Sequence, residues 1–216
     1  MKSVTLLAAT ARTTGLSILG LLAMSGAAFA HHPTGGRTPA TFTEGLLSGF
    51  GHPVIGLDHF AFVLAIGLLA IGQRQRLLIP AGFVLMTVVG TGLHLMGFNL
   101  FSVEATVAVS VLAAGGLLFA NRHYRAGGLA LLGAVAGLFH GYAYGESIIG
   151  AEIGPLFAYL AGFSVIQYCI AITAMWGGAK MMAAANTASI TRFSRAAGAT
   201  VCSVGVVYLG LAMQAA

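Results

Sequence analysis

The chain has 216 residues, of which 58% are hydrophobic, and it carries only ten Lys and Arg and five Asp and Glu residues. Soluble domains contain roughly 25% charged residues, which they need to cover their surface. At 7% charged, the chain is excluded from the soluble enzymes, the nucleic-acid-binding proteins and the disordered chains, despite a formal net charge of +5. We therefore predict a membrane protein. Its two cysteines, Cys169 and Cys202, lie far apart in apolar stretches and indicate neither a disulfide framework nor a CxxC metal site.

The first 30 residues have the pattern of a cleavable secretory signal peptide. Lys2 and Arg12 provide a basic start, residues 16–24 an apolar core, and Ala30 ends an Ala-x-Ala cleavage site. The core is short for a membrane span of about 20 residues, which favours a signal peptide over an uncleaved first helix. We expect a signal peptide over 1–30 and a periplasmic segment over 31–45. That segment would begin with His31 and His32, a pair that could collect metal outside the cytoplasm.

Six apolar stretches follow, and each is long enough to cross a hydrocarbon core of about 30 Å as a helix. They span residues 46–71, 77–97, 103–120, 127–145, 155–177 and 196–214. Helices are expected because a backbone that faces lipid must satisfy its own hydrogen bonds. The predicted fold is an all-α polytopic membrane protein with six transmembrane helices in one domain over 46–216.

The basic residues predict the orientation of this domain. Of the eight Lys and Arg residues that follow the signal peptide, only Arg37 lies outside the first, third and fifth connections between spans. Basic connections face the cytoplasm. We therefore expect a multi-pass protein of the bacterial inner membrane with both mature termini in the periplasm. The seven residues in those connections are Arg74, Arg76, Arg122, Arg125, Lys180, Arg192 and Arg195.

Acidic and histidine side chains gather toward the opposite, outer side of four successive spans. An ionisable residue inside a membrane is costly and indicates a functional site. Imidazole and carboxylate groups together suit nickel, cobalt or zinc, whereas oxygen ligands alone suit magnesium or calcium. The candidate ligands are His52, Asp58 and His59 in the first span, His94 in the second, Glu104 in the third, and His140 and Glu146 in the fourth.

The first group of candidates requires a break in its helix. His52 and His59 are seven positions apart, which is about 10.5 Å along a regular helix and too far for two nitrogens that bind one ion at about 2 Å. Pro53 removes a helical hydrogen bond and Gly56 permits unusual dihedral angles. A break there would fold His52 back toward Asp58, as discontinuous helices do in transporters. The alternative is structural: His52 caps a helix and His59 bonds to neighbouring backbone.

The fourth span carries a glycine at every fourth position, at residues 133, 137, 141 and 145. Such a ridge lets another helix approach closely, and we interpret it as a packing feature. His140 and Glu146 are six positions apart, so they meet only through partners on other helices or a bend at Gly145.

Two motifs resemble those of a known family. The pattern H-x5-DH, formed by His52, Asp58 and His59, resembles the signature of the HupE/UreJ nickel and cobalt permeases. The segment 139–143, Phe-His-Gly-Tyr-Ala, followed by Glu146, is similar to that family's second motif, F-H-G-x-[AV] with a nearby Glu. Tyr144 stands where many relatives carry histidine.

The resemblance implies ATP-independent import of Ni²⁺ or Co²⁺ across the inner membrane, which would supply hydrogenase, urease or cobalamin synthesis. The metal ion would be the transported substrate and no cofactor is implied. By matching position, the resemblance implies that the ion binds His52, Asp58, His59, His140 and Glu146. Glu104 and His94 join this set only through their depth in the membrane.

Two other functions fit the same residues. In a zinc-dependent intramembrane hydrolase, histidines and an acid would hold zinc and activate water, and one metal would stay tightly bound. In a bis-histidine haem protein, two of His52, His59, His94 and His140 would ligate iron, and a Soret band would reveal it. The partners expected of a permease are the metal ion and the lipid bilayer, with no nucleic acid. Nickel cannot be separated from cobalt on ligand preference.

Overall fold

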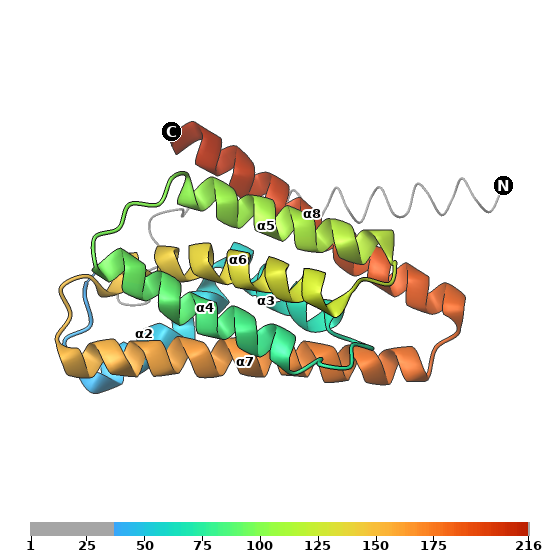
Figure 1. The fold of residues 1–216 in the computed structure, drawn as a ribbon, viewed down its shortest axis with the longest axis horizontal. Helices are drawn as coiled ribbons and strands as arrows, with labels where there is room; N and C mark the ends of the chain where they lie inside the picture. The colour runs from blue at the N-terminus through green and yellow to red at the C-terminus, as the bar shows by residue number, and fades with distance from the viewer. Residues whose placement is uncertain (1–36, 216) are drawn as a thin grey trace.

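The computed structural model describes residues 37–215, and every regular element in this range is helical. The helices lie side by side in an elongated bundle, as Figure 1 shows. The predicted signal peptide over 1–30 and the His31–His32 pair lie outside the described residues. The elements are α2 (Phe42–Ile55), α3 (Leu57–Leu69), α4 (Leu78–Leu95), α5 (Val103–Ala120), α6 (Ala126–Gly145), the short 3₁₀ helix η2 (Glu146–Ile148), α7 (Ile153–Ala183) and α8 (Thr187–Ala215).

Five of these helical segments are long and apolar enough to cross a membrane, and the bent pair α2–α3 raises the number to as many as six. The protein is therefore a multi-pass membrane protein with five to six candidate spans. The predicted stretches match the helices in order and place. The span predicted over 46–71 is the exception, because it is divided into two helices.

The connection implied between the spans predicted over 155–177 and 196–214 is wrong in extent, because α7 continues to Ala183 and α8 begins at Thr187. Only residues 184–186 separate the two helices. Hydropathy locates the apolar part of a helix, whereas Ala, Met, Lys and Arg all favour helical backbone beyond it. Lys180 and Arg192 therefore extend from helical turns.

The break between α2 and α3 bends the chain by 77°. With 14 and 13 residues, the two helices are about 21 and 20 Å long, so neither alone crosses a core of about 30 Å. The predicted break at Pro53 and Gly56 is confirmed: Pro53 lies in the last turn of α2, and Gly56 separates the helices.

The reason for a glycine at the break differs from the prediction. Gly56 has φ −71° and ψ 99°, which does not require glycine. A Cβ atom at this position would lie 2.6 Å from Cδ2 of His59, however, and would displace the imidazole. Glycine is therefore needed here to make room for the His59 ring and not to permit a dihedral angle.

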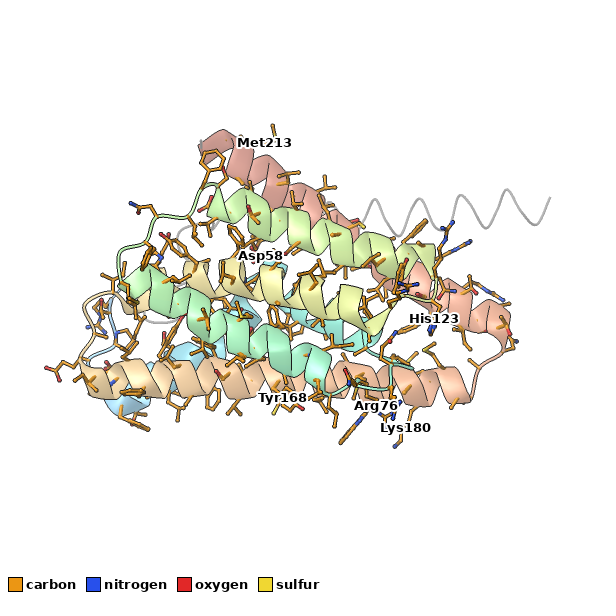
Figure 2. All side chains as sticks on the ribbon, viewed as in Figure 1. Asp58, Arg76, His123, Tyr168, Lys180 and Met213 are labelled. Carbon is orange, nitrogen blue, oxygen red and sulfur yellow. The ribbon has the colours of Figure 1, made fainter. Side chains whose placement is uncertain are left out.

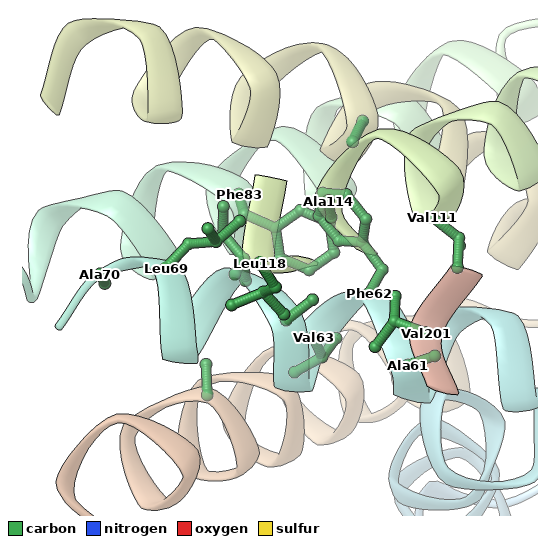
Figure 3. Packing of buried hydrophobic residues seen from close by; sticks show 14 of the residues in the cluster. Ala61, Phe62, Val63, Leu69, Ala70, Phe83, Val111, Ala114, Leu118 and Val201 are labelled. Atoms are coloured by element: carbon green, nitrogen blue, oxygen red, sulfur yellow. The ribbon is translucent and has the colours of Figure 1, made fainter. Parts of the chain in front are cut away.

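Helix α3 occupies the centre of the bundle, where nine of its 13 residues are buried and where it contacts α4, α5, α6, α7 and α8. Around it, α2 packs on α7, α4 on α6 and α5 on α8. Figure 3 shows Phe62 and Val63 of α3 packed with Phe83 of α4 and Leu118 of α5. This apolar core surrounds the half of α3 that follows Asp58 and His59.

The glycine ridge of α6 packs against α4, which confirms its predicted packing role. Cβ atoms added to Gly137 and Gly141 would meet backbone atoms of Phe83 and Thr87 on α4, respectively. One added to Gly145 would meet the His94 side chain, 2.6 Å from its Cβ atom. The ridge therefore sets how closely α6, which carries His140, approaches α4.

Replacing Gly141 with Ala should destabilise the protein, because the added methyl group overlaps the Thr87 backbone. Overpacking of this kind costs about 1–3 kcal/mol, and the melting temperature in detergent should fall by about 3–10 °C. Gly128→Ala is the matched control, since a Cβ at Gly128 meets nothing within 4 Å. Equal melting temperatures for both variants would show that α6 does not pack on α4 in this way.

Charged residues separate between the two ends of the bundle. The α3–α4 and α5–α6 connections and the α7–α8 corner lie at one end, where Figure 2 shows Arg76, His123 and Lys180. The exposed acids Glu44, Glu104, Glu146 and Glu152 lie at the opposite end, at the start of α2, the start of α5 and the α6–α7 connection. We refer to these as the basic end and the acidic end.

Candidate functional site

The break in the first span brings two predicted ligands together inside the bundle. His52, in the last turn of α2, and His59, in the first turns of α3, are both 3% exposed. Their ring centroids lie 5.7 Å apart, although the residues are seven positions apart in sequence. Asp58 and His140 complete a buried group of four side chains, which we call the histidine cluster.

Asp58 is the only buried acid among the described residues. It lies in the first turn of α3, where its carboxylate accepts a hydrogen bond of 2.8 Å from the His59 backbone N–H. A helix N-terminus stabilises a negative charge at this position. The Asp58 Oδ1 atom lies 4.0 Å from Nε2 of His59, so the carboxylate and the imidazole face each other. Figure 2 shows Asp58 in the interior of the bundle.

His52 is held from α7 and η2. Its Nδ1 atom lies 3.0 Å from the Tyr159 hydroxyl and 3.0 Å from the Ser147 hydroxyl. Tyr159 in turn donates a hydrogen bond of 2.9 Å to the backbone carbonyl of Tyr144. The imidazole is thus oriented by groups on two other elements. A role for His52 as a simple helix cap does not require these contacts.

His59 is held from α6 and α5 through His140. The Nδ1 atoms of His59 and His140 are 2.8 Å apart, and Nε2 of His140 lies 2.9 Å from the Ser110 hydroxyl. Beneath His140, the rings of Phe62 and Phe83 have centroids 4.9 and 5.7 Å from its own. These rings form an apolar floor between the histidine cluster and the basic end.

Tyr144 closes the space between the two helices of the broken span. Its ring centroid lies 4.7 Å from that of His52 and 4.7 Å from that of His59. Its hydroxyl donates a hydrogen bond of 3.3 Å to the Gln167 side chain, which is itself buried in α7. A tyrosine ring therefore stands between the two histidines of the broken span.

The structure does not bring the other three predicted ligands into this cluster. Glu104 is exposed at the start of α5, and Glu146 is exposed at the start of η2. His94 lies in the last turn of α4 with its ring 4.3 Å from that of Tyr142. Its buried Nδ1 atom has no hydrogen-bond partner among the described residues.

Sequence reasoning missed Ser110, Ser147 and Tyr159, which contact the cluster directly. Ser147 follows the Glu146 that the motif suggested, and the 3₁₀ turn places the serine inward and the glutamate outward. Ser110 carried a weak signal as a polar residue inside an apolar span. Serine often bonds only to its own helix, so sequence cannot separate the two roles.

The separations in the cluster can be compared with the distances that one metal ion would require. A metal–nitrogen bond of about 2.1 Å places a ring centroid about 3.2 Å from the ion, so two imidazoles on one ion have centroids at most about 6.4 Å apart. The 5.7 Å between His52 and His59 meets this limit. Asp58 Oδ1 and His59 Nε2, 4.0 Å apart, need to close by less than about 1 Å to reach adjacent positions on one ion.

The cluster is not a closed metal cage. Within residues 37–215, no three His, Cys, Asp or Glu side chains are arranged so that they could hold a metal ion as they stand. The Nδ1 atoms of His59 and His140 bond to each other. These side chains could therefore hold a metal ion only after a rearrangement.

A family model of the HupE/UreJ proteins matches residues 19–208. Among curated proteins, the chain is 30% identical over 122 residues to Protein HupE of Rhizobium leguminosarum bv. viciae. The match covers 56% of this chain and 63% of that relative, slightly less than two thirds of it. No solved structure matches the chain. The chain belongs to the HupE/UreJ family.

Proposed function

We propose that this protein imports Ni²⁺ or Co²⁺ across the bacterial inner membrane without ATP. The observation that carries the proposal is the bent first span, which gathers His52, Asp58 and His59 in the interior of a membrane protein. Imidazole and carboxylate are the ligands that suit these ions. We place the basic end in the cytoplasm and both mature termini in the periplasm, following the positive-inside rule.

His52, Asp58 and His59 are the proposed ligands, and His140 contacts His59 at their edge. A buried carboxylate offsets part of the charge of a divalent ion that has lost water. Glu104 and Glu146 lie at the acidic end, and they would attract the ion before it enters. The metal delivered inside would supply hydrogenase, urease or cobalamin synthesis, as expected for the family.

The apolar floor makes the proposed transport depend on a conformational change. Phe62 and Phe83, whose rings form this floor, are fully buried. A cavity of about 150 Å³ lies beyond them, lined by Leu69, Leu118 and Arg122 among others. Rotation of α3 about Gly56 would carry Asp58 and His59 relative to His52 and loosen this floor.

The membrane potential suffices to drive entry. A potential of 100 mV, negative inside, favours the inward movement of two charges by about 4.6 kcal/mol. Transport as a uniporter is therefore the simplest mechanism.

Reconstitution into liposomes tests the proposed transport. With a negative-inside potassium diffusion potential, we expect ⁶³Ni²⁺ or ⁵⁷Co²⁺ to accumulate in vesicles that contain the protein. Each ion should inhibit uptake of the other, whereas Mg²⁺ in excess should not. Empty vesicles and vesicles without a potential are the controls. Uptake no faster than in empty vesicles would contradict the proposal, and tight retention of one Zn²⁺ without flux would favour the hydrolase.

A further inference from the structure

We propose that Ser110 with His140, and Tyr159 with Ser147, are positioning residues that hold a hydrogen on Nδ1 of His59 and of His52, so that both imidazoles present Nε2 to the ion. The effect on metal binding rests on the proposed function, whereas the positions of the hydrogens follow from the hydrogen bonds alone. Metal-binding histidines usually donate their other N–H to a fixed partner, which sets the tautomer and the orientation of the ring.

The hydrogen bonds of Ser110 determine the direction of the hydrogen bonds that link it through His140 to His59. Its hydroxyl donates its one hydrogen to the Val107 carbonyl, 2.6 Å away, and can then only accept from His140 Nε2 at 2.9 Å. A neutral His140 that carries its hydrogen on Nε2 has a lone pair on Nδ1. His59, 2.8 Å away, must therefore donate from its own Nδ1.

The hydrogen bonds of Tyr159 and Ser147 give the same result for His52. Tyr159 donates its one hydrogen to the Tyr144 carbonyl at 2.9 Å, so its oxygen can only accept from His52 Nδ1 at 3.0 Å. If Nδ1 carried no hydrogen, two acceptors would face each other at this distance. Ser147, also 3.0 Å from Nδ1, then presents its oxygen to the same N–H.

These two sets of hydrogen bonds come from different helices, and both place the hydrogen on Nδ1 of a histidine. Both histidines carry the hydrogen on Nδ1 and a lone pair on Nε2, which on His59 is the nitrogen 4.0 Å from the Asp58 carboxylate. His140 therefore acts through His59 and is not itself a ligand.

Loss of the Ser110 hydroxyl should reverse the direction of the hydrogen bond between His140 and His59. Without the hydroxyl, a hydrogen on His140 Nε2 would be a buried donor without an acceptor, which costs about 1–3 kcal/mol. His140 would instead carry its hydrogen on Nδ1 and donate to His59. His59 would then carry its hydrogen on Nε2, and that hydrogen would have to leave before Nε2 could bind the ion.

The test compares Ser110→Ala with Ser203→Ala in the full chain, purified in detergent. Ser203 bonds only to the Ala199 carbonyl of its own helix among the contacts that the structure gives it, at 3.0 Å, so its loss is a matched control. We expect Ser110→Ala to weaken Co²⁺ binding, measured by calorimetry and by visible absorption, by about 10–100-fold. Ser110→Thr, which keeps the hydroxyl, should restore binding. Tyr159→Phe should weaken binding to a similar degree through His52.

Nitrogen NMR of ¹⁵N-histidine-labelled protein without metal tests the tautomers directly. His59 and His52 should show hydrogen on Nδ1 in the unmodified protein, and His59 should change to Nε2 in Ser110→Ala. Hydrogen on Nε2 of His59 in the unmodified protein would overturn the inference, whether or not metal is transported. So would unchanged Co²⁺ binding in both Ser110→Ala and Tyr159→Phe. Predicted tautomers without any Co²⁺ or Ni²⁺ binding would instead reject the proposed function.

Discussion

Asp58→Asn is expected to lower Ni²⁺ and Co²⁺ uptake by at least about 100-fold, which is about 2.8 kcal/mol. Asp58 is the only buried acid in the described part of the chain, and no other carboxylate lies in the histidine cluster. A unit charge about 4 Å from a divalent ion interacts with it by about 8 kcal/mol even at an effective dielectric constant of about 20. The loss of water by the ion and the carboxylate opposes a large part of this attraction. A neutral asparagine at this position would lack nearly all of the attraction.

Glu152→Gln is the control that separates the loss of a buried acid from the loss of an exposed one. Glu152 is exposed at the start of α7, where water and salt screen its charge. We expect its loss to change the initial rate of uptake in liposomes by less than about threefold, because exposed charges contribute little. Similar losses in both variants would mean that the ion responds to the charge of the acidic end, and that Asp58 is not a ligand.

His59→Ala is the second change with a large expected effect. Removing a ligand should cost more than the 10–100-fold typical of outer contacts, so we expect metal affinity to fall by at least about 100-fold. The change also leaves a cavity in a site that is 3% exposed and removes the partner of His140 Nδ1. Calorimetric titration with Ni²⁺ and Co²⁺ measures the affinity, and size-exclusion chromatography confirms that the protein is folded.

His59→Asn separates ligation from folding. Its amide can take the place of Nδ1 and keep the contact with His140, but it offers nothing at the position of Nε2. We expect a folded protein that binds no better than His59→Ala. His123→Ala, at an exposed histidine in the α5–α6 connection, should bind as the unmodified protein does. Normal affinity in His59→Asn would exclude Nε2 of His59 as a ligand.

The bent span links the local sequence to the proposed transport. Pro53 and Gly56 end α2 and allow α3 to leave at 77°, which places the first turn of α3 beside the last turn of α2. The partial negative charge at the C-terminal end of α2 favours a cation there, and Asp58 offsets the positive end of α3. Discontinuous helices in transporters hold ions in the same manner.

Much of this architecture follows from one-dimensional patterns. Apolar length determined the spans, because a helix must cover the whole hydrocarbon core. Pro53 and Gly56 predicted the break in the first span, because proline removes a helical hydrogen bond. The separation of acidic and basic residues along the chain determined which connections share an end of the bundle. The four-residue glycine spacing determined which face of α6 packs closely.

Only the tertiary structure decided which polar side chains meet. Glu146 and Ser147 are neighbours in sequence, but one turn of 3₁₀ helix exposes the glutamate and places the serine against His52. Ser110 and Tyr159 reach the cluster from separate helices, and their contacts depend on the rotation of each helix about its axis. Hydropathy does not specify that rotation when a helix is apolar on nearly every side. Packing of α5 and α7 around α3 does, and it thereby determines which nitrogen each histidine presents.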